Sequence, residues 1–293
     1  QRGGDFGLQL FREAVGGGFA LREELPLGGQ AADVAIVDLD RDRDEAVDIV
    51  VAAPANRSIT VFKGPGRGRL NEGLSIPLDS RPIRVVLAAA SGGASPLVAA
   101  STSALHVVAP QAGGGFGPVM KVEIPAVIVD MAAADLDGAP GDELVVVDLS
   151  GGRVLLLAME AAGAMRELRS HAVGSAPRSL AAADFDGDGN LDIAVADRGT
   201  SSVVVLFRPA TEQGSRATIE AGAPPAAVLA FDWSADGKQD LAIATRGGVD
   251  LHWGDGAGAF SRGRALPDMT DAVDLASGDL DGDGEADLLA ATR

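Results

Sequence analysis

The sequence contains short segments in which aspartate alternates with other residues. In DFDGDGNLD, Asp184, Asp186 and Asp188 are two positions apart and Asp192 ends the segment, and DLDGDGEAD repeats the arrangement near the C-terminus. Alternate aspartates on a tight loop can direct several carboxylates into one hole, and the glycine at the sixth position lets the backbone reverse. Such hard oxygen ligands suit Ca²⁺ better than Zn²⁺, which prefers nitrogen and sulfur donors. Without a cation the carboxylates would repel one another, so we expect the metal to be structural.

Other segments keep part of this pattern. Segment 232–240 has Ser234 in place of one carboxylate, and segment 135–143 has Ala139 at the fifth position, with Asp142 as a candidate substitute. In the first copy, two extra residues make the alignment of the acids ambiguous. The copy at 88–96 has no carboxylate, so we expect that copy to bind no metal. We predict up to five Ca²⁺ ions. The candidate ligands are Asp38, Asp40, Asp42, Asp44, Asp48, Asp135, Asp137, Glu143, Asp184, Asp186, Asp188, Asp192, Asp232, Ser234, Asp236, Asp240, Asp279, Asp281, Asp283 and Asp287.

An EF-hand loop begins with a similar spacing of acids. That loop also needs a bidentate glutamate at position 12 and a helix on each side. Position 12 here is Val195 or Ala290, and the flanking segments have the pattern of strands. The EF-hand and dockerin-like interpretations are therefore disfavoured.

The acid segments belong to a repeat that covers the whole chain. The last acids before each apolar run are separated by 95, 49, 48 and 47 residues, so the first interval spans two periods. A degenerate copy, SPLVAAS at 95–101, fills this interval and has Pro96 where the acid is expected. Six copies of about 48 residues thus form one domain over residues 1–293. The acids that define the period are Asp48, Glu143, Asp192, Asp240 and Asp287.

Each copy has four short apolar segments separated by turn residues. Four strands in a period of 40–50 residues are typical of a β-propeller blade. The chain ends after the second strand of its last copy, in DLLAATR (287–293), and it begins with a third and a fourth strand, GLQLF (7–11) and GGGFALREEL (16–25). We therefore predict an all-β, six-bladed propeller with four antiparallel strands per blade. Its last blade is closed by the N- and C-terminal strands together, which removes unpaired edges.

Three elements recur in a fixed order: the DxDxDGxxDL loop, the continuation ADRGTSSVVVLF and the element GDGAGAF. Together they resemble FG-GAP/VCBS repeats, the propeller repeats that also occur in integrin α-subunits and in many secreted bacterial proteins. The resemblance covers essentially the whole chain. It implies a calcium-stabilised propeller, usually extracellular, that serves adhesion or ligand binding. Integrin-type propellers have seven blades and this sequence counts six, so their partners are not carried over.

Composition excludes several classes of protein. With 42 acidic and 24 basic residues the formal charge is -18, which does not supply the basic face that nucleic acid requires. Nineteen of the acids are candidate metal ligands, so the rest of the chain is nearly neutral. There is no cysteine for disulfides or thiolate sites. Apolar runs are too short for a membrane span, and we expect no membrane insertion. The start at Gln1 without a leader predicts a mature form or an excised domain.

The sequence shows no catalytic constellation. His106, His171 and His252 lie in separate strand patterns without a partner beside them, and no serine lies in a GxSxG motif. Trp233, at the second position of an acid loop, and Trp253, at the end of a third strand like Phe62 and Phe207, are predicted to pack in the core. We therefore expect no enzymatic activity.

A ligand face is expected opposite the acid loops. In an up-and-down blade, the connections between strands two and three and between blades share that face. They contain arginines and two aspartates that would form a mixed-charge rim around the central channel, suited to an anionic or zwitterionic partner. The alternative is that each arginine is a solvated neighbour of a turn glycine, repeated with the period. The residues are Arg57, Arg84, Asp130, Arg153, Arg178, Arg198, Arg246 and Asp274.

These observations leave three functions open. The favoured one is a monomeric protein- or glycan-binding module used in adhesion, located in the extracellular space, the periplasm or at the cell surface. The second is a propeller-scaffold polysaccharide lyase or hydrolase in which Asp130, Arg178 and Asp274 do acid–base work. The third is a non-binding structural spacer of a larger surface protein. Fold alone does not decide among them.

Overall fold

The computed structural model describes residues 7–13, 19–39, 47–64, 73–90, 95–111, 115–160, 163–280 and 286–292. Within these ranges the protein consists of 24 β-strands and contains no α-helix, and none of its elements is a helix that could cross a membrane. The all-β class that the sequence predicts is confirmed.

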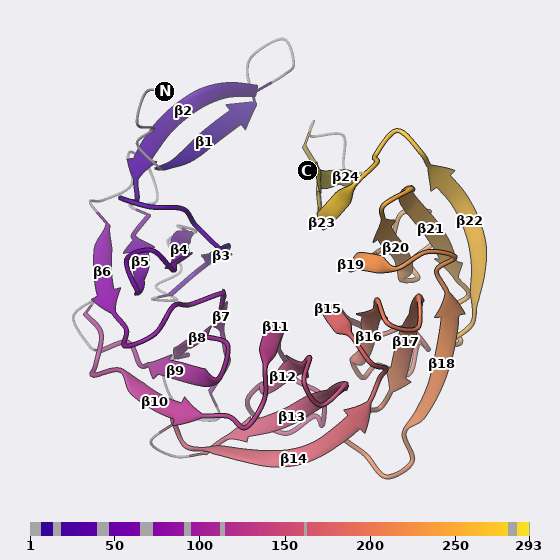
Figure 1. Cartoon of the computed structure of the whole chain (residues 1–293), viewed down its shortest axis with the longest axis horizontal. Coiled ribbons are helices and arrows are strands. Elements are labelled where there is room, and N and C mark those ends of the chain that lie inside the picture. Colours follow the sequence, from indigo (N-terminus) through magenta and orange to yellow (C-terminus); the bar gives the residue numbers. More distant parts are fainter. Residues whose placement is uncertain are drawn as a thin grey trace.

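Five complete four-stranded sheets follow one another along the chain, and we call them blades 1 to 5. In each blade consecutive strands pair antiparallel, and the first strand is the innermost in Figure 1. The strands are β3 Asp33–Val37, β4 Asp48–Ala53, β5 Ser58–Phe62 and β6 Leu74–Pro77 in blade 1; β7 Arg84–Leu87, β8 Leu97–Ala100, β9 Ala104–Val108 and β10 Met120–Glu123 in blade 2; β11 Ile128–Ala134, β12 Glu143–Asp148, β13 Arg153–Met159 and β14 Met165–Ala172 in blade 3; β15 Pro177–Ala183, β16 Asp192–Asp197, β17 Ser202–Phe207 and β18 Ser215–Glu220 in blade 4; and β19 Pro225–Phe231, β20 Asp240–Thr245, β21 Gly248–Gly254 and β22 Phe260–Leu266 in blade 5.

The order of strands within a blade follows from their composition. The second strands, such as DIVVAA in β4 and ELVVVD in β12, are buried along their whole length. A neighbouring sheet covers each of their faces, so they are apolar throughout instead of alternating. Outer strands such as β18 alternate between exposed and half-buried residues because one face meets water. Small residues, as in the AAA of β15, fill the first strands, where the blades converge.

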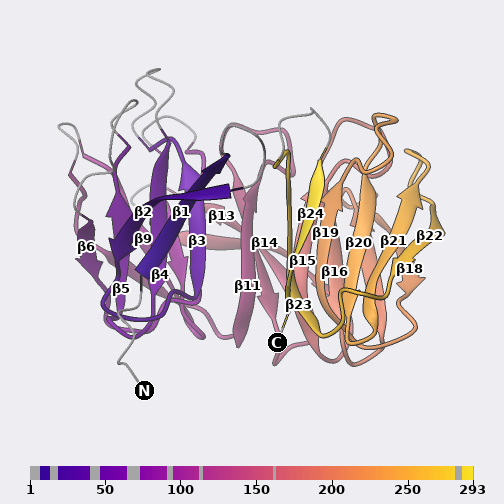
Figure 2. The same ribbon diagram turned by 90° about the horizontal axis from the view of Figure 1, so that it is seen from above.

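The core is divided into layers between neighbouring sheets. Each interface contains its own cluster of buried side chains, from Ile59 between blades 1 and 2 to Leu241 between blades 4 and 5. The blades therefore stand radially around a channel, and their strands run roughly along its axis (Figures 1 and 2). This arrangement is a β-propeller.

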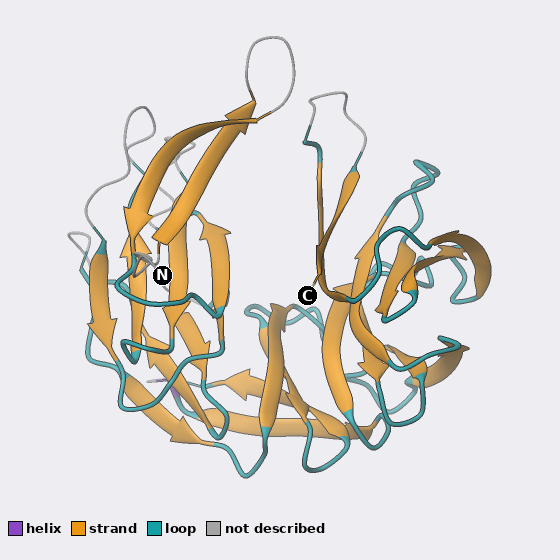
Figure 3. Ribbon diagram, turned by 45° about the horizontal axis from the view of Figure 1, so that its top comes forward, coloured by secondary structure: helices purple, strands orange, loops and turns teal. Residues whose placement is uncertain are grey.

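The terminal strands form two separate pairs. β1 (Gly7–Glu13) pairs with β2 (Phe19–Pro26), and β23 (Ala272–Gly278) pairs with β24 (Asp287–Thr292). The predicted strand pairs at both ends are thus present, but the described residues do not join them into the single closed blade that the sequence predicts. Figures 1 and 3 show the space between the two pairs.

Packing explains why each pair is held without the other. Leu25 and Leu27 pack on Ile49 and Phe62 of blade 1. On the other side of the space, β23 and β24 pack on blade 5, with Ala272 fully inside that cluster. Each half-sheet therefore buries apolar surface on a complete blade, and strand pairing between the halves is not needed to hold them in place.

Replacing Ile193 of β16 by alanine should lower stability strongly. Ile193 is fully buried between blades 3 and 4, so we expect a loss of about 2–5 kcal/mol in the free energy of unfolding. Leu74 of the outer strand β6 is 47% exposed, and Leu74→Ala is the control, expected to cost less than about 1 kcal/mol. Urea denaturation measures the free energy of unfolding of both variants. Equal losses in the two variants would contradict the assignment of Ile193 to the core.

Candidate functional site

The acid loops all join the first and second strands of a blade, so they lie on one face of the propeller. In the loop of blade 4, oxygens of Asp184, Asp186 and Asp188 lie within 4.8 Å of one another. Asp184 accepts hydrogen bonds from the N–H groups of Gly187 and Gly189, at 2.8 and 2.9 Å. Gly189, the sixth residue, has a φ of 85°, a left-handed conformation that favours glycine. Main-chain donors therefore hold the three carboxylates together.

One cation of the protein already contacts this cluster. The guanidinium of Arg208 forms an ion pair with Asp188, whose pKa lies below its ordinary value because the N–H of Asn190 and the Arg208 side chain bond the charged form. The carboxylates are half-buried. Oxygen ligands of this number and spacing fit Ca²⁺.

The loop of blade 3 brings together Asp135, Asp137 and Glu143, again with oxygens within 4.8 Å. Asp135 and Asp137 are exposed, and Glu143 is buried. Burial, together with the nearby aspartates, raises the pKa of Glu143. Asp142, the candidate substitute for the fifth ligand, is not grouped with these three residues, and its Oδ2 accepts the N–H of Ala89 in blade 2.

The remaining loops are described in part. In blade 5, Asp232 accepts the N–H groups of Asp236 and Gly237, and Asp236 pairs with Lys238 at 3.3 Å. The described residues do not group these acids as they do in blades 3 and 4. The predicted ligands that lie outside the described residues are Asp40, Asp42, Asp44, Asp281 and Asp283.

The last acid of each loop, at the start of the second strand, has a second role that sequence reasoning missed. Asp192 Oδ2 accepts the N–H of Phe185 at 3.0 Å, and Oδ1 accepts the N–H of Arg208 at 2.9 Å. Burial raises the pKa of Asp192 to about 6, and the charges of Asp186 and Asp188 add to this effect. The same bond from the second loop residue occurs at Asp48, Glu143, Asp240 and Asp287, whose donors are Leu39, Leu136, Trp233 and Leu280.

On the inner strands, one position links neighbouring blades around the channel. Asp33 accepts the N–H of Val85 in blade 2 at 2.8 Å, and Asp130 accepts the N–H of Leu180 in blade 4 at 2.9 Å. Arg84 Nε lies 2.6 Å from Asp130 Oδ1. Burial raises the pKa of Asp130, although Arg84 opposes that shift. By strand register the equivalent residues are Asp33, Arg84, Asp130, Ser179, Ala227 and Asp274.

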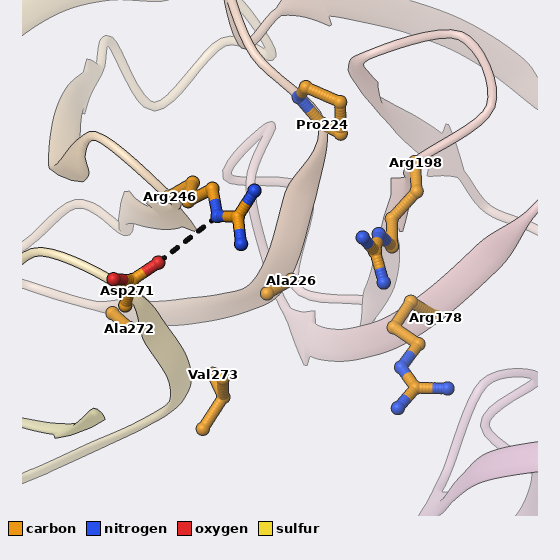
Figure 4. Close-up of a pocket in the computed structure, with 8 residues that line it drawn as sticks. All are labelled: Arg178, Arg198, Pro224, Ala226, Arg246, Asp271, Ala272 and Val273. Atoms are coloured by element: carbon orange, nitrogen blue, oxygen red, sulfur yellow. Dashed lines mark hydrogen bonds and ion pairs between the residues drawn. The ribbon is translucent and has the colours of Figure 1, made fainter. Parts of the chain in front are cut away.

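The opposite face has a pocket of about 380 Å³ at the channel mouth. Arg178, Arg198 and Arg246 line it, and Figure 4 shows Arg246 across from the other two. Arg246 Nε lies 3.2 Å from Asp271 Oδ1. Arg178 and Arg198 are exposed and have no ion-pair partner among the described residues. Three of the predicted face residues therefore meet in one site, which can receive an anionic group.

Other predicted face residues lie elsewhere. Arg84 and Asp274 line an adjoining pocket of about 310 Å³, which Arg178 also borders. Arg57 occupies the turn after β4, with a φ of 50°, and Arg153 pairs with Asp148 at 3.0 Å; neither lines the two pockets. Asp271 was not among the predicted face residues, because its position before β23 carries no motif.

The histidines and tryptophans have structural surroundings. His106 is buried, and its Nε2 lies 2.9 Å from Asp79 Oδ1, whereas His171 Nε2 bonds the carbonyl of Pro209. Trp233 and Trp253 are half-buried and pack against the cluster between blade 5 and β23–β24, which confirms the predicted packing role without full burial. Asp130, a candidate for acid–base work, is engaged by Arg84 and by main-chain donors, so the described site shows no free acid–base pair at that residue.

This chain is similar to several known proteins. A family model described as an FG-GAP-like repeat matches residues 135–195 and 232–290. Comparison with curated protein sequences gave no match. Solved structures that are similar include BBS1N in complex with ARL6DN (18% identity, TM-score 0.65, 88% of this chain and 75% of that chain), an Agrocybe aegerita lectin that recognises non-reducing terminal N-acetylglucosamine (16%, 0.59, 88% and 73%) and virginiamycin B lyase from Staphylococcus aureus (10%, 0.58, 92% and 81%).

At these identities the likeness extends to the fold alone. The similar structures include a lectin and an enzyme, so the fold fits a binding or scaffold module and leaves the chemistry to the individual site. The matched segments begin at Asp135 and Asp232, the first acids of two loops, and each ends in the second strand of the next copy, β16 or β24. The chain is therefore a β-propeller that contains FG-GAP-like repeats at residues 135–195 and 232–290.

Proposed function

We propose that this protein is a calcium-stabilised binding module, located outside the cytoplasm, that recognises an anionic group of an extracellular protein or glycan. The observation that carries the proposal is the pocket formed by Arg178, Arg198 and Arg246. Two of its three cations are unpaired within the described residues, and guanidinium groups bind carboxylate, sulfate or phosphate groups through paired hydrogen bonds.

The surroundings of the pocket support a ligand role. Pro224, Ala226 and Val273 supply an apolar floor, against which a bound anion would be partly removed from water. Removal from water strengthens charge-assisted hydrogen bonds. If the arginines only accompanied turn glycines, each would be expected to lie alone in solvent.

Replacing Arg178 and Arg198 by alanine should abolish binding of anionic ligands. An array of uronate-containing, sulfated and neutral glycans together with extracellular proteins would identify the ligand, and isothermal titration would measure its affinity. We expect each single variant to weaken binding by about 10- to 100-fold, corresponding to about 1.5–3 kcal/mol for a hydrogen bond to a charged group.

Arg264 on the outer strand β22 is exposed and provides the matched control, since Arg264→Ala removes the same charge far from the pocket. Equal weakening by Arg264→Ala would show a nonspecific charge effect and would contradict the proposed site. Product released from the same glycans would instead support the hydrolase or lyase alternative.

Calcium is proposed as the ion that holds the acid loops. The grouped carboxylates of Asp184, Asp186 and Asp188 supply the oxygen chemistry that Ca²⁺ takes. Asp192 would act mainly by holding the loop, because main-chain N–H groups engage both of its oxygens. The blade 3 set lacks the fifth-position acid, so its affinity is expected to be lower.

Removing calcium should lower the melting temperature. Saturating Ca²⁺ at one hundred times its Kd stabilises a protein by about 2.7 kcal/mol per site, and EDTA would remove this contribution.

Because the raised pKa of Asp192 disfavours its charged form in the metal-free protein, stability without metal should fall as the pH rises from about 4 to about 6. The calcium-dependent gain in Tm should accordingly be larger above pH 6 than below pH 4. Calorimetry with metal analysis tests this; an unchanged Tm and no bound calcium would refute the loop assignment.

A closed ring of six blades is proposed from the inner-strand links. Asp33, Asp130 and Ser179 each accept the N–H of the residue that follows the equivalent position in the next blade. Asp274 occupies this position in β23, and the corresponding N–H in blade 1 belongs to Val34. Closure would let Asp274 accept that N–H while β24 pairs with β1, completing the sixth blade.

Hydrogen exchange at Val34 tests closure. In a closed ring the Val34 amide should be protected, and Asp274→Ala should reduce its protection by at least about tenfold because the acceptor is lost. The Val85 amide, bonded to Asp33 at 2.8 Å, is the internal control and should keep its protection. A Val34 amide that exchanges without protection in the unmodified protein would show an open ring.

A further inference from the structure

The largest described pocket lies between blades 2 and 3, on the face of the acid loops. Its volume is about 820 Å³, within the range of about 300–1,000 Å³ that is typical of small-molecule sites. Its apolar walls include Val107 and Met120 of blade 2 and Met159 of blade 3. It is separate from the arginine pocket, which opens on the opposite face.

The interface between blades 4 and 5 shows two large side chains in the equivalent place. There the second loop residue is Phe185, and the third-strand residue opposite Asp192 is Phe207; both are buried. Phe185 also packs edge-to-face on Phe260 of blade 5, with ring centroids 5.6 Å apart. Large side chains at these positions close the gap between the blades.

Blade 2 has alanine at both positions. Ala88 N bonds Pro96 O, which aligns Ala90 with Phe185, and the β8–β9 register aligns Ala109 with Phe207. Both alanines line the pocket. The blade 2 loop, which contains no carboxylate, therefore also lacks these two aromatic side chains, and the pocket lies in the space that they fill in blade 4.

The polar wall of the pocket is acidic. Arg166 lies 2.8 Å from Glu160, so these two charges compensate each other. Asp137 and Glu143 have no cationic partner among the described residues. Glu143 is 5% exposed; its Oε2 accepts the N–H of Leu136, and its Oε1 accepts no hydrogen bond within the described part of the chain.

Glu143 Oε1 differs from the equivalent carboxylate oxygens of blades 1, 4 and 5 in its hydrogen bonding. In blades 1, 4 and 5 the second carboxylate oxygen of this residue accepts an N–H from the end of the third strand, namely from Gly64, Arg208 and Gly254. In blade 3 the corresponding oxygen remains available on a pocket wall. A buried carboxylate in an apolar cavity favours a ligand that brings both a positive charge and hydrogen-bond donors.

We propose that this pocket binds a small amphipathic amine, with its apolar body between the blades and its ammonium group at Asp137 and Glu143. The body occupies the space that Phe185 and Phe207 fill in blade 4. Both carboxylates also belong to the blade 3 acid cluster, so Ca²⁺ and the ammonium group compete for them. The site does not depend on the arginine pocket.

Three probes with one apolar body and different charges test the ligand class. Isothermal titration of the full chain with 4-phenylbutylamine, 4-phenylbutan-1-ol and 4-phenylbutyrate, without added calcium, should show the amine binding at least about tenfold more tightly than either analogue. Added Ca²⁺ should weaken the binding of the amine and leave the affinity for the alcohol unchanged. Equal affinities, or tighter binding of the carboxylate, would overturn the proposal.

Variants test the location. Ala90→Phe combined with Ala109→Phe restores the side chains of blade 4, and it should reduce amine affinity at least about tenfold while Tm is kept or raised. Asp137→Asn should weaken the binding of the amine but not of the alcohol. This variant tests the location if the double phenylalanine variant fails to fold. Glu167→Gln, which removes an exposed charge on β14, is the control. Unchanged amine binding in the filled or Asp137→Asn variant, or a loss in the control, would refute the site.

Discussion

The burial of each second strand between two neighbouring sheets is the constraint on which the rest of the structure depends. β16 begins with Asp192 and ends with Asp197, and neither residue is exposed. A buried carboxylate must receive hydrogen bonds, and at each end of the strand the donors come from the adjacent connections. The same strand therefore organises the acid loop on one face and, through the N–H of Ala176 and Thr200, the turns on the other.

The carboxyl groups at the two ends of this strand have pKa values shifted in opposite directions. Burial disfavours the charged form of both carboxylates. At Asp197, hydrogen bonds from Thr200 and Ala176 outweigh burial, and the pKa falls. At Asp192, burial dominates, and Asp186 and Asp188 add repulsion, so the pKa rises. At one end the chain's own donors outweigh burial, whereas at the other the carboxylates outnumber the single guanidinium of Arg208. That difference separates a structural turn from an acid loop within a single repeat.

Sequence periodicity could predict much of this fold because the hydrophobic pattern records which strands are covered on both faces. The strand pairs at both termini, the acid loops and the core positions of Trp233 and Trp253 follow from it. Register was harder to predict. The sequence aligns Phe62 with Phe207, but strand pairing places Phe62 opposite Ile49 and Phe207 opposite Asp192. A shift of one residue reverses the face on which a side chain lies.

Contacts between blades could not be predicted because they join residues about one period apart. The hydrogen bond from Val85 N–H to Asp33 and the ion pair between Arg84 and Asp130 depend on how neighbouring sheets are rotated around the channel. The pocket beside Ala90 has the same origin. An alanine in an Ala-rich segment carries no signal until its equivalence to Phe185 is known from the hydrogen bonds of the strand.

The separation of the two faces bears on how an acidic protein could present the proposed anion site. β16 contains 6 residues, and at roughly 3.3 Å per residue it separates the acid loop from the Arg198 turn by about 20 Å. Charges in solvent are screened over about 8–10 Å at physiological ionic strength. The carboxylates of one face therefore contribute little to the potential at Arg178 and Arg198. Bound calcium would reduce that contribution further, so the local arginines, and not the net charge of -18, would set the proposed preference of the opposite face.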